Sequence, residues 1–324
     1  MTAHPELDYF IVSLEDVHFV GSGLSRPESV LCTRAGDVFT SHRPGGVSWI
    51  RPDGTQRRIG DSAIVPNGIA LLPDNSFLLA NHSDNGGVYR LTLDGVIEPY
   101  LTEVEGVPLP SVNFVYCDGF GRIWICVSTV RKGDNQYRHN VRDGFIVLLE
   151  GTRARIVADG LCWTNECRVD AQGTTLYVNE TFGRRLTRFR IAPDGTLCDR
   201  EVVTEFGAGS FPDGLALDVE GGIWIASVGS NRVIRVTPDG RQHIVVEDSD
   251  SAHLAELDAA LEQHALTRPM LMNNRSARLK NISSIAFGGA DGRTIHLGCL
   301  GGDALATFIV PVAGVPPAHW DYRF

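Results

Sequence analysis

The stretch DGLALDVEGGIWIASV, residues 213–228, decides the fold of this 324-residue chain. A polar residue opens it, and a short apolar segment, a turn rich in Asp and Gly and a second apolar segment follow. Alternating side-chain character favours strands over a helix, and Gly, Asn and Asp are the usual residues of hairpin turns. The stretch therefore predicts a β-hairpin.

Five further stretches repeat this pattern. They are ESVLCTRAGDVFTSH (28–42), NGIALLPDNSFLLANH (67–82), NFVYCDGFGRIWICVS (113–128), NECRVDAQGTTLYVNE (165–180) and SIAFGGADGRTIHLGC (284–299). The six openings are 39, 46, 52, 48 and 71 residues apart, which is typical of four-stranded blades. Strand–turn–strand signals between the repeats, such as SWIRPDGTQRRI and VIRVTPDGRQHIVV, supply the outer strands. The sequence predicts an all-β, six-bladed β-propeller that forms a single domain over residues 1–324.

Two segments stand apart from the repeats. AHLAELDAALEQHAL has apolar residues at helical spacing, which predicts a helical insertion near residues 250–280. The insertion is either a surface excursion or a lid over one mouth of the channel. The strand-like stretch within residues 8–20 and TFIVPV near the C-terminus are expected to complete one blade together and close the ring.

Charge and cysteine content exclude several classes of protein. The net charge of −10 is spread along the chain, which disfavours nucleic acid and anionic membranes as partners. No apolar run approaches the roughly 18 residues of a membrane span, and the N-terminus lacks the pattern of a secretory signal. Seven cysteines without a CxxC pair indicate buried, reduced thiols. We expect a cytoplasmic protein with a small-molecule substrate, and its oligomeric state stays open.

The residues that open the repeats occupy equivalent positions around the predicted channel. They are Glu28, Asn67, Asn113, Asn165, Asp213 and Ser284. Carboxylate and amide oxygens are ligands for hard cations such as Ca²⁺, Mg²⁺ or Mn²⁺. The alternative is a water-filled channel with a hydrated polar rim. Two carboxylates on one axis repel each other unless a cation lies between them, which favours a cation.

In these residues the chain resembles the SMP-30/gluconolactonase/luciferin-regenerating-enzyme family. The resemblance is most specific in FPDGLALDVEGGIWIASVGSNRVIRVTPDG (211–240) and extends to PESV (27–30) and NECRVDAQGTTLYVNET (165–181). It implies that Glu28, Asn165 and Asp213 are metal ligands, with Asn113 at the metal or the substrate. It also implies a divalent-metal-dependent lactonase or related esterase. Ca²⁺ is our first choice of metal, with Mn²⁺, Mg²⁺, Zn²⁺ and Fe²⁺ as alternatives.

The chain departs from this family near the third opening residue. Sugar lactonases of the family tend to carry an Arg and an Asp where this chain has Ser111 and Phe114. We therefore expect Asn113, Ser111, Phe114 and His82 to bind substrate, and expect a relatively apolar lactone or ester rather than a sugar lactone. Asn165 is followed by Glu166 instead of Gly, so a further carboxylate either lies near the metal or faces outward.

The expected reaction is hydrolysis by water. Asp213 is the candidate general base, and His42, His82, His139 and Glu180 are unranked candidates to share that role. The sequence has no GxSxG nucleophile elbow. Two rival functions are condensation of an amine with an aldehyde by a strictosidine-synthase-like propeller, and binding without catalysis.

Overall fold

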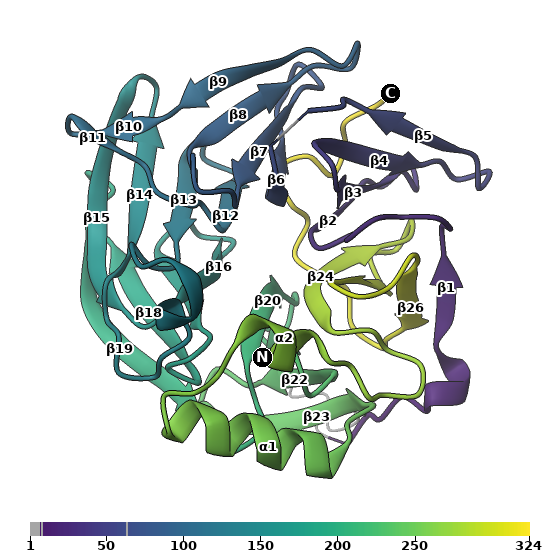
Figure 1. The fold of residues 1–324 in the computed structure, drawn as a ribbon. Helices are drawn as coiled ribbons and strands as arrows, with labels where there is room; N and C mark the ends of the chain where they lie inside the picture. The colour runs from purple at the N-terminus through teal and green to yellow at the C-terminus, as the bar shows by residue number, and fades with distance from the viewer. Residues whose placement is uncertain (1–6, 8, 63) are drawn as a thin grey trace.

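The computed structural model describes residues 7, 9–62 and 64–324 of the chain. In this part of the chain, six antiparallel four-stranded sheets are arranged around a central channel (Figure 1). Each sheet runs from an inner strand at the channel to an outer strand at the rim. The prediction of an all-β, six-bladed propeller is therefore confirmed.

The blades follow one another in chain order. Blade 1 contains β2 (Val30–Cys32), β3 (Val38–His42), β4 (Gly46–Ile50) and β5 (Gln56–Ile59), and blade 2 contains β6 (Pro66–Leu71), β7 (Phe77–Asn81), β8 (Val88–Leu91) and β9 (Ile97–Leu101). Blade 3 contains β12 (Phe114–Cys117), β13 (Ile123–Val127), β14 (Gly144–Glu150) and β15 (Arg153–Leu161), and blade 4 contains β16 (Thr164–Val169), β17 (Thr175–Glu180), β18 (Arg185–Ile191) and β19 (Leu197–Glu205). Blade 5 contains β20 (Pro212–Leu217), β21 (Ile223–Ser227), β22 (Arg232–Val236) and β23 (Gln242–Glu247). A short hairpin, β10 (Glu103–Val104) and β11 (Val107–Pro108), joins blades 2 and 3.

Blade 6 closes the ring with strands from both ends of the chain. It contains β24 (Ile282–Gly288), β25 (Thr294–Cys299), β26 (Leu305–Ile309) and β1 (His18–Val20). β1 pairs antiparallel with β26, with Phe19 opposite Ala306. Closure of this kind joins the last blade to the first and leaves only the outer edges of the blades at the rim. The predicted pairing of the two ends is confirmed. Residues 1–6 and 8, which include most of the N-terminal segment in which a secretory signal would lie, are outside the described part of the chain.

The turns between inner strands have the backbone that the sequence predicts. Each contains a residue with φ between 64° and 94°, namely Gly36, Asn75, Gly121, Gly173, Gly221 and Gly292. In blades 3 and 5, an Asp at the start of this turn accepts hydrogen bonds from turn amides and from a buried Trp. The Nε1 atoms of Trp124 and Trp224 each lie 2.8 Å from the carboxylates of Asp118 and Asp218. These bonds satisfy the only polar atom of each indole in the core.

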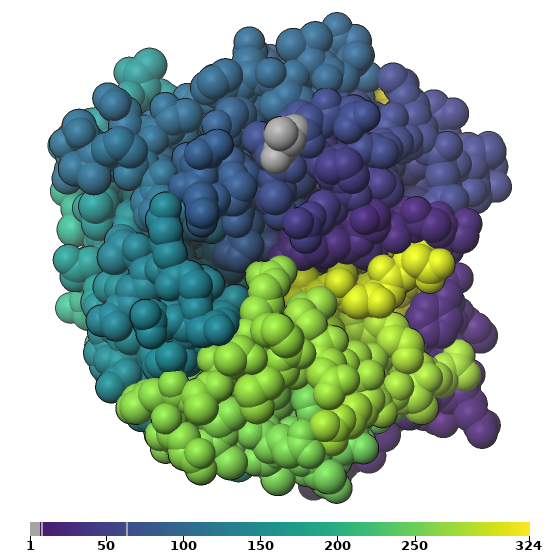
Figure 2. Space-filling view, viewed as in Figure 1, coloured from purple at the N-terminus to yellow at the C-terminus, as the bar shows by residue number. Residues whose placement is uncertain are grey.

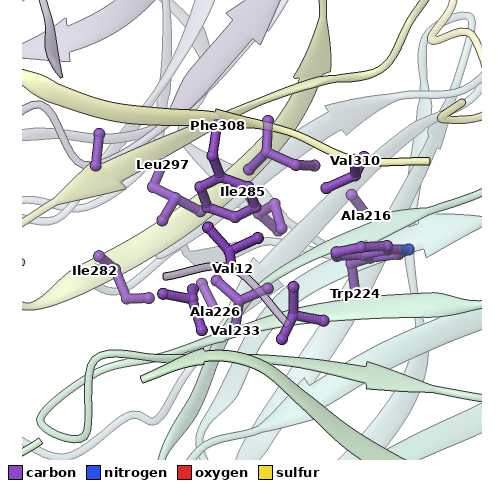
Figure 3. Close-up of a cluster of buried hydrophobic side chains, with 14 of the residues drawn as sticks. Val12, Ala216, Trp224, Ala226, Val233, Ile282, Ile285, Leu297, Phe308 and Val310 are labelled. Carbon is purple, nitrogen blue, oxygen red and sulfur yellow. The ribbon is translucent and has the colours of Figure 1, made fainter. Parts of the chain in front are cut away.

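The hydrophobic core lies between neighbouring blades. Figure 3 shows one such layer, in which Trp224 of blade 5 and Phe308 of blade 6 pack with Val12 from the N-terminal segment. Residues far apart in the chain thus bury a continuous apolar layer, and burial of each large side chain contributes about 1.5–3 kcal/mol.

The predicted insertion is helical. It contains α1 (Ser251–Glu262) and α2 (Arg268–Met272), and it extends from the rim of blade 5 toward the channel (Figures 1 and 2). Leu257 and Leu261 of α1 are fully buried in a cluster that includes Trp163, Phe182 and Phe211. Two short 3-10 turns are η2 (Leu14–Asp16) and η3 (Gly133–Gln136). None of the helices in the described residues has the length and apolar character needed to cross a bilayer.

Candidate active site

Five of the six opening residues line one buried pocket at the mouth of the channel, on the side of the insertion. They are Glu28, Asn67, Asn113, Asn165 and Asp213, and each is at most 6% exposed. Ser284 is fully buried but does not line this pocket. The structure therefore brings together every opening residue that carries a carboxylate or an amide. The six opening residues are called ring residues below.

Irregularities in the inner strands position these side chains. In blades 2, 4 and 5 the register between the first two strands shifts at the ring residue, and such bulges re-aim side chains. In two of these blades a glycine follows the ring residue, because the next inner strand lies very close. A Cβ atom on Gly214 would lie 2.4 Å from the Cα atom of Ser284. The Asn-Gly and Asp-Gly pairs of the repeats thus bring neighbouring inner strands together around the pocket.

Hydrogen bonds hold Glu28, Asn67 and Asn165 on one side. Asn67 Nδ2 donates to Glu28 Oε1 (2.8 Å) and to the Asn113 carbonyl (2.9 Å), while Arg26 Nη2 donates to Asn67 Oδ1 (2.6 Å). On the opposite side, Asn165 Nδ2 donates to Thr181 Oγ1 (2.9 Å). These bonds fix the orientations of the two side-chain amides, and they leave the Asn165 oxygen free to face the pocket.

Two buried oxygens of the pocket have no hydrogen-bond partner among the described residues: Glu28 Oε2 and Asn165 Oδ1. An unsatisfied buried acceptor costs about 1–3 kcal/mol, and more when it is charged. Together with the Asp213 carboxylate, they form a set of hard oxygen donors at one pocket. This set fits a divalent cation such as Ca²⁺, Mg²⁺ or Mn²⁺.

A third carboxylate lies beneath the first two. Glu166 is 1% exposed, and its Oε2 accepts hydrogen bonds from Arg168 (3.0 Å) and from the Leu215 amide (3.2 Å). Burial raises the pKa of Glu28 to about 8, with Glu166 adding to the rise and Arg26 opposing it. Burial, followed by the charges of Glu28 and Glu166, also raises the pKa of Asp213 well above its ordinary range. Positive charge placed in this pocket would favour the ionised carboxylates.

The predicted substrate residues are divided between two sides of the inner strand. His82 lines the pocket, and its Nδ1 lies 3.0 Å from Ser111 Oγ in an adjoining cavity. Phe114 does not line this pocket. Its ring packs beneath the Arg168 guanidinium, 4.8 Å away, and borders a separate cavity within the channel. β12 begins at Phe114 with a regular register, so alternation turns Phe114 away from Asn113.

Of the other predicted proton carriers, three lie outside the pocket. His42 is hydrogen-bonded to Ser48 Oγ through Nδ1 (2.8 Å), and His139 stacks on His264 with ring centroids 4.7 Å apart. Glu180 is held by Arg185, Thr187 and the Cys162 amide. These bonds outweigh the opposing effect of burial and lower the pKa of Glu180, as expected for a structural ion pair.

Several residues of the pocket are not among those predicted from the sequence. Arg26 precedes the first repeat by two positions, and Arg268, Leu271 and Met272 come from the insertion. Trp163 and Phe182 flank the fourth repeat at either end and form an apolar wall. These residues lie outside the repeats, so a comparison of equivalent positions in the repeats does not identify them. The insertion nevertheless forms part of the pocket wall.

Comparison with known proteins agrees with this architecture. Residues 83–249 match the family model of the SMP-30/Gluconolactonase/LRE-like region. The 6-deoxy-6-sulfogluconolactonase of Pseudomonas putida is 27% identical over 175 residues, which cover 53% of this chain and 57% of that protein. The chain spans about half the length of the curated relatives it matches.

Two solved structures share the fold over nearly the whole chain. A gluconolactonase from Xanthomonas campestris has a TM-score of 0.69 at 20% identity and covers 95% of this chain and 94% of its own. Regucalcin from Agrobacterium tumefaciens, described as a calcium-binding protein, has a TM-score of 0.67 at 18% identity and covers 94% of this chain and 98% of its own. At these identities the structures establish the fold alone. The family model, which spans just over half of the chain, establishes the family: the protein belongs to the SMP-30/gluconolactonase/LRE-like family.

Proposed function

We propose that this protein is a divalent-metal-dependent hydrolase that opens a lactone or a related ester. The observation that carries the proposal is the pair of buried, unpartnered oxygens, Glu28 Oε2 and Asn165 Oδ1, beside the Asp213 carboxylate. Family membership supports lactone hydrolysis, and the names of a sulfogluconolactonase and a gluconolactonase among the matching proteins agree with it. We favour Ca²⁺, which is also the metal in the description of the regucalcin neighbour.

In the proposed site, Glu28, Asn165 and Asp213 would hold the cation. A cation bound there would polarise the lactone carbonyl and stabilise the negative charge that develops on its oxygen. Asp213 accepts a proton from the water that adds to the carbonyl carbon. The bond between that carbon and the ring oxygen then breaks, and the proton passes to the leaving oxygen. The product is the open hydroxy acid.

The remaining pocket residues bind and orient the substrate. Asn113 lies beside the proposed ligands, and the His82–Ser111 pair forms a polar edge. Trp163, Phe182 and Met272 supply an apolar wall. The proposed preference for a relatively apolar lactone therefore rests on this wall rather than on Phe114.

Substitution of Asp213 tests the proposal. Asp213→Asn should remove both the bound metal and at least 100-fold of the lactonase activity, because it deletes a charged ligand that also acts as the base. Elemental analysis and a pH-indicator assay on a panel of lactones measure the two effects. Glu98→Gln, on the half-exposed outer strand β9, is the matched control and should change neither. An Asp213→Asn protein with full activity would overturn the proposal.

A further inference from the structure

Cationic side chains gather on one side of the candidate active site. Arg26 and Arg268 both line the pocket that contains Glu28 and Asp213. An adjoining cavity of about 140 Å³, here called the basic annex, is lined by Lys132, Arg131, Arg268, Ser111 and His82 among others. Arg268 and His82 border both spaces, so the annex adjoins the pocket.

Part of this positive charge lacks an anionic partner within the part of the chain that the structure describes. Arg131 lies 3.4 Å from Asp143, but neither Arg268 nor Lys132 forms an ion pair with any residue the structure describes. Arg26 donates only to neutral oxygens, those of Asn67 and the Pro66 carbonyl, and its buried Nε has no partner among the described residues.

The side chains that line the annex carry a net positive charge, opposite in sign to the charge of the whole chain. Asp84 is the one carboxylate among the described residues that line the annex, whereas the chain as a whole carries a formal charge of −10. Burial and then the charges of Arg26 and Arg268 lower the pKa of His82 to about 3. Unpaired cations in a concave site concentrate anions there, even on an acidic protein.

We propose that the substrate carries an anionic oxygen group in addition to its lactone and its apolar part, and that Arg268 and Lys132 bind this group in the basic annex while the apolar part contacts Trp163 and Phe182. The inference rests on the proposed function, which places the lactone carbonyl at Asp213. A molecule in that position lies beside His82 and Arg268, which border both spaces. The Arg268 guanidinium matches a carboxylate, sulfonate or phosphate through two parallel hydrogen bonds. The insertion thereby determines specificity through α2, the helix that begins at Arg268.

Matched lactones that differ only in one charge test this assignment. The probes are a γ-lactone with a ring carboxylate, its sulfonate and phosphate analogues, and the neutral primary amide. The wild-type protein should hydrolyse at least one anionic lactone with a kcat/KM at least tenfold above that of the amide, and the advantage should fall with rising salt. Arg268→Gln should abolish the advantage, so that the anionic lactones and the amide are hydrolysed at similar rates, Lys132→Gln should reduce it, and Arg268→Lys should retain part of it. Which anion is preferred identifies the group.

The control is Arg275→Gln, in the same insertion, where Arg275 is paired with Glu256 and lines neither space. It should retain the full advantage. Equal rates on anionic and neutral lactones would overturn the inference while leaving the proposed function intact. Equal losses on both in Arg268→Gln would also overturn it, because Arg268 would then act on ring opening itself.

A binding measurement separates this inference from the proposed function. The lactam analogue of the carboxylated lactone resists hydrolysis, and its binding is measured by calorimetry on the metal-loaded protein. Binding by the wild-type protein that weakens at least tenfold in Arg268→Gln would support the annex even if no lactone were hydrolysed. Absence of binding would overturn it.

Discussion

Asn67 connects three elements of the pocket through one side chain. Its amide group donates to Glu28 and to the Asn113 carbonyl, and its oxygen accepts from Arg26. A carboxylate at this position could not donate to Glu28, so the amide is required by the chemistry of its neighbours. Asn165 is held in the same way by Thr181, and in each case a bond on one side orients an oxygen of the ring.

The apolar wall leads to a prediction for substrate preference. Met272 ends α2 and lines the pocket, whereas Met270 lies on the same helix and does not. Met272→Asn should lower kcat/KM on an alkyl-substituted lactone about fivefold, which is roughly 1 kcal/mol of lost apolar contact. Gluconolactone hydrolysis should change little, and Met270→Asn is the control. A wild-type preference for gluconolactone of tenfold or more would refute the apolar substrate.

At the scale of elements, blade 4 is stabilised by a buried ion pair. Glu180 at the end of β17 accepts two hydrogen bonds from Arg185 of β18 and one from Thr187. Its side chain is fully buried, so loss of its charge would leave Arg185 without its main partner. The residue therefore contributes to the stability of the blade rather than to the reaction.

Removal of this charge should destabilise the protein in a pH-dependent way. We expect Glu180→Gln to lower the free energy of unfolding by about 3 kcal/mol at pH 7. The pKa of Glu180 is lowered in the folded state. Its stabilising effect is therefore present above the unfolded pKa of about 4.3 and is lost as the pH falls through the folded value. Urea unfolding at pH 7 and pH 3.5 measures the change, and the difference from wild type should shrink at the lower pH.

The exposed pair of Arg188 with Glu201 supplies the comparison. Glu201→Gln should cost less than about 1 kcal/mol, because solvent screens exposed pairs. A loss in Glu180→Gln that is equally large at both pH values would contradict the assignment.

At the scale of the whole molecule, repetition made the fold predictable from sequence. Turn residues such as Gly36 and Asn75 act locally, and their recurrence establishes the number of blades. Equivalent positions in a closed ring meet at the axis, so Glu28 and Asp213 could be predicted as neighbours. The proposal of one domain over residues 1–324 rests on the same closure.

Features outside the repeat could not be predicted in this way. Arg268 reaches the pocket from an insertion that has no counterpart in other blades. The resemblance predicts Phe114 at the substrate, because sugar lactonases of the family tend to carry an Asp at this position, but the regular register of β12 turns Phe114 to the other side. Arg26 has a left-handed backbone, with φ of 50°, just before the first repeat. No turn motif in the sequence predicts this conformation.

Removal and replacement of the metal tests the central claim most directly. The protein is stripped with a chelator, dialysed, and assayed for lactone hydrolysis before and after addition of Ca²⁺ or Mn²⁺, while thermal unfolding is followed in parallel. We predict that the stripped protein loses at least 100-fold in kcat/KM and that one divalent cation per chain restores it. The melting temperature should rise with the concentration of the cation, because the cation binds the folded state. Full lactonase activity in protein shown by elemental analysis to be metal-free would contradict the account.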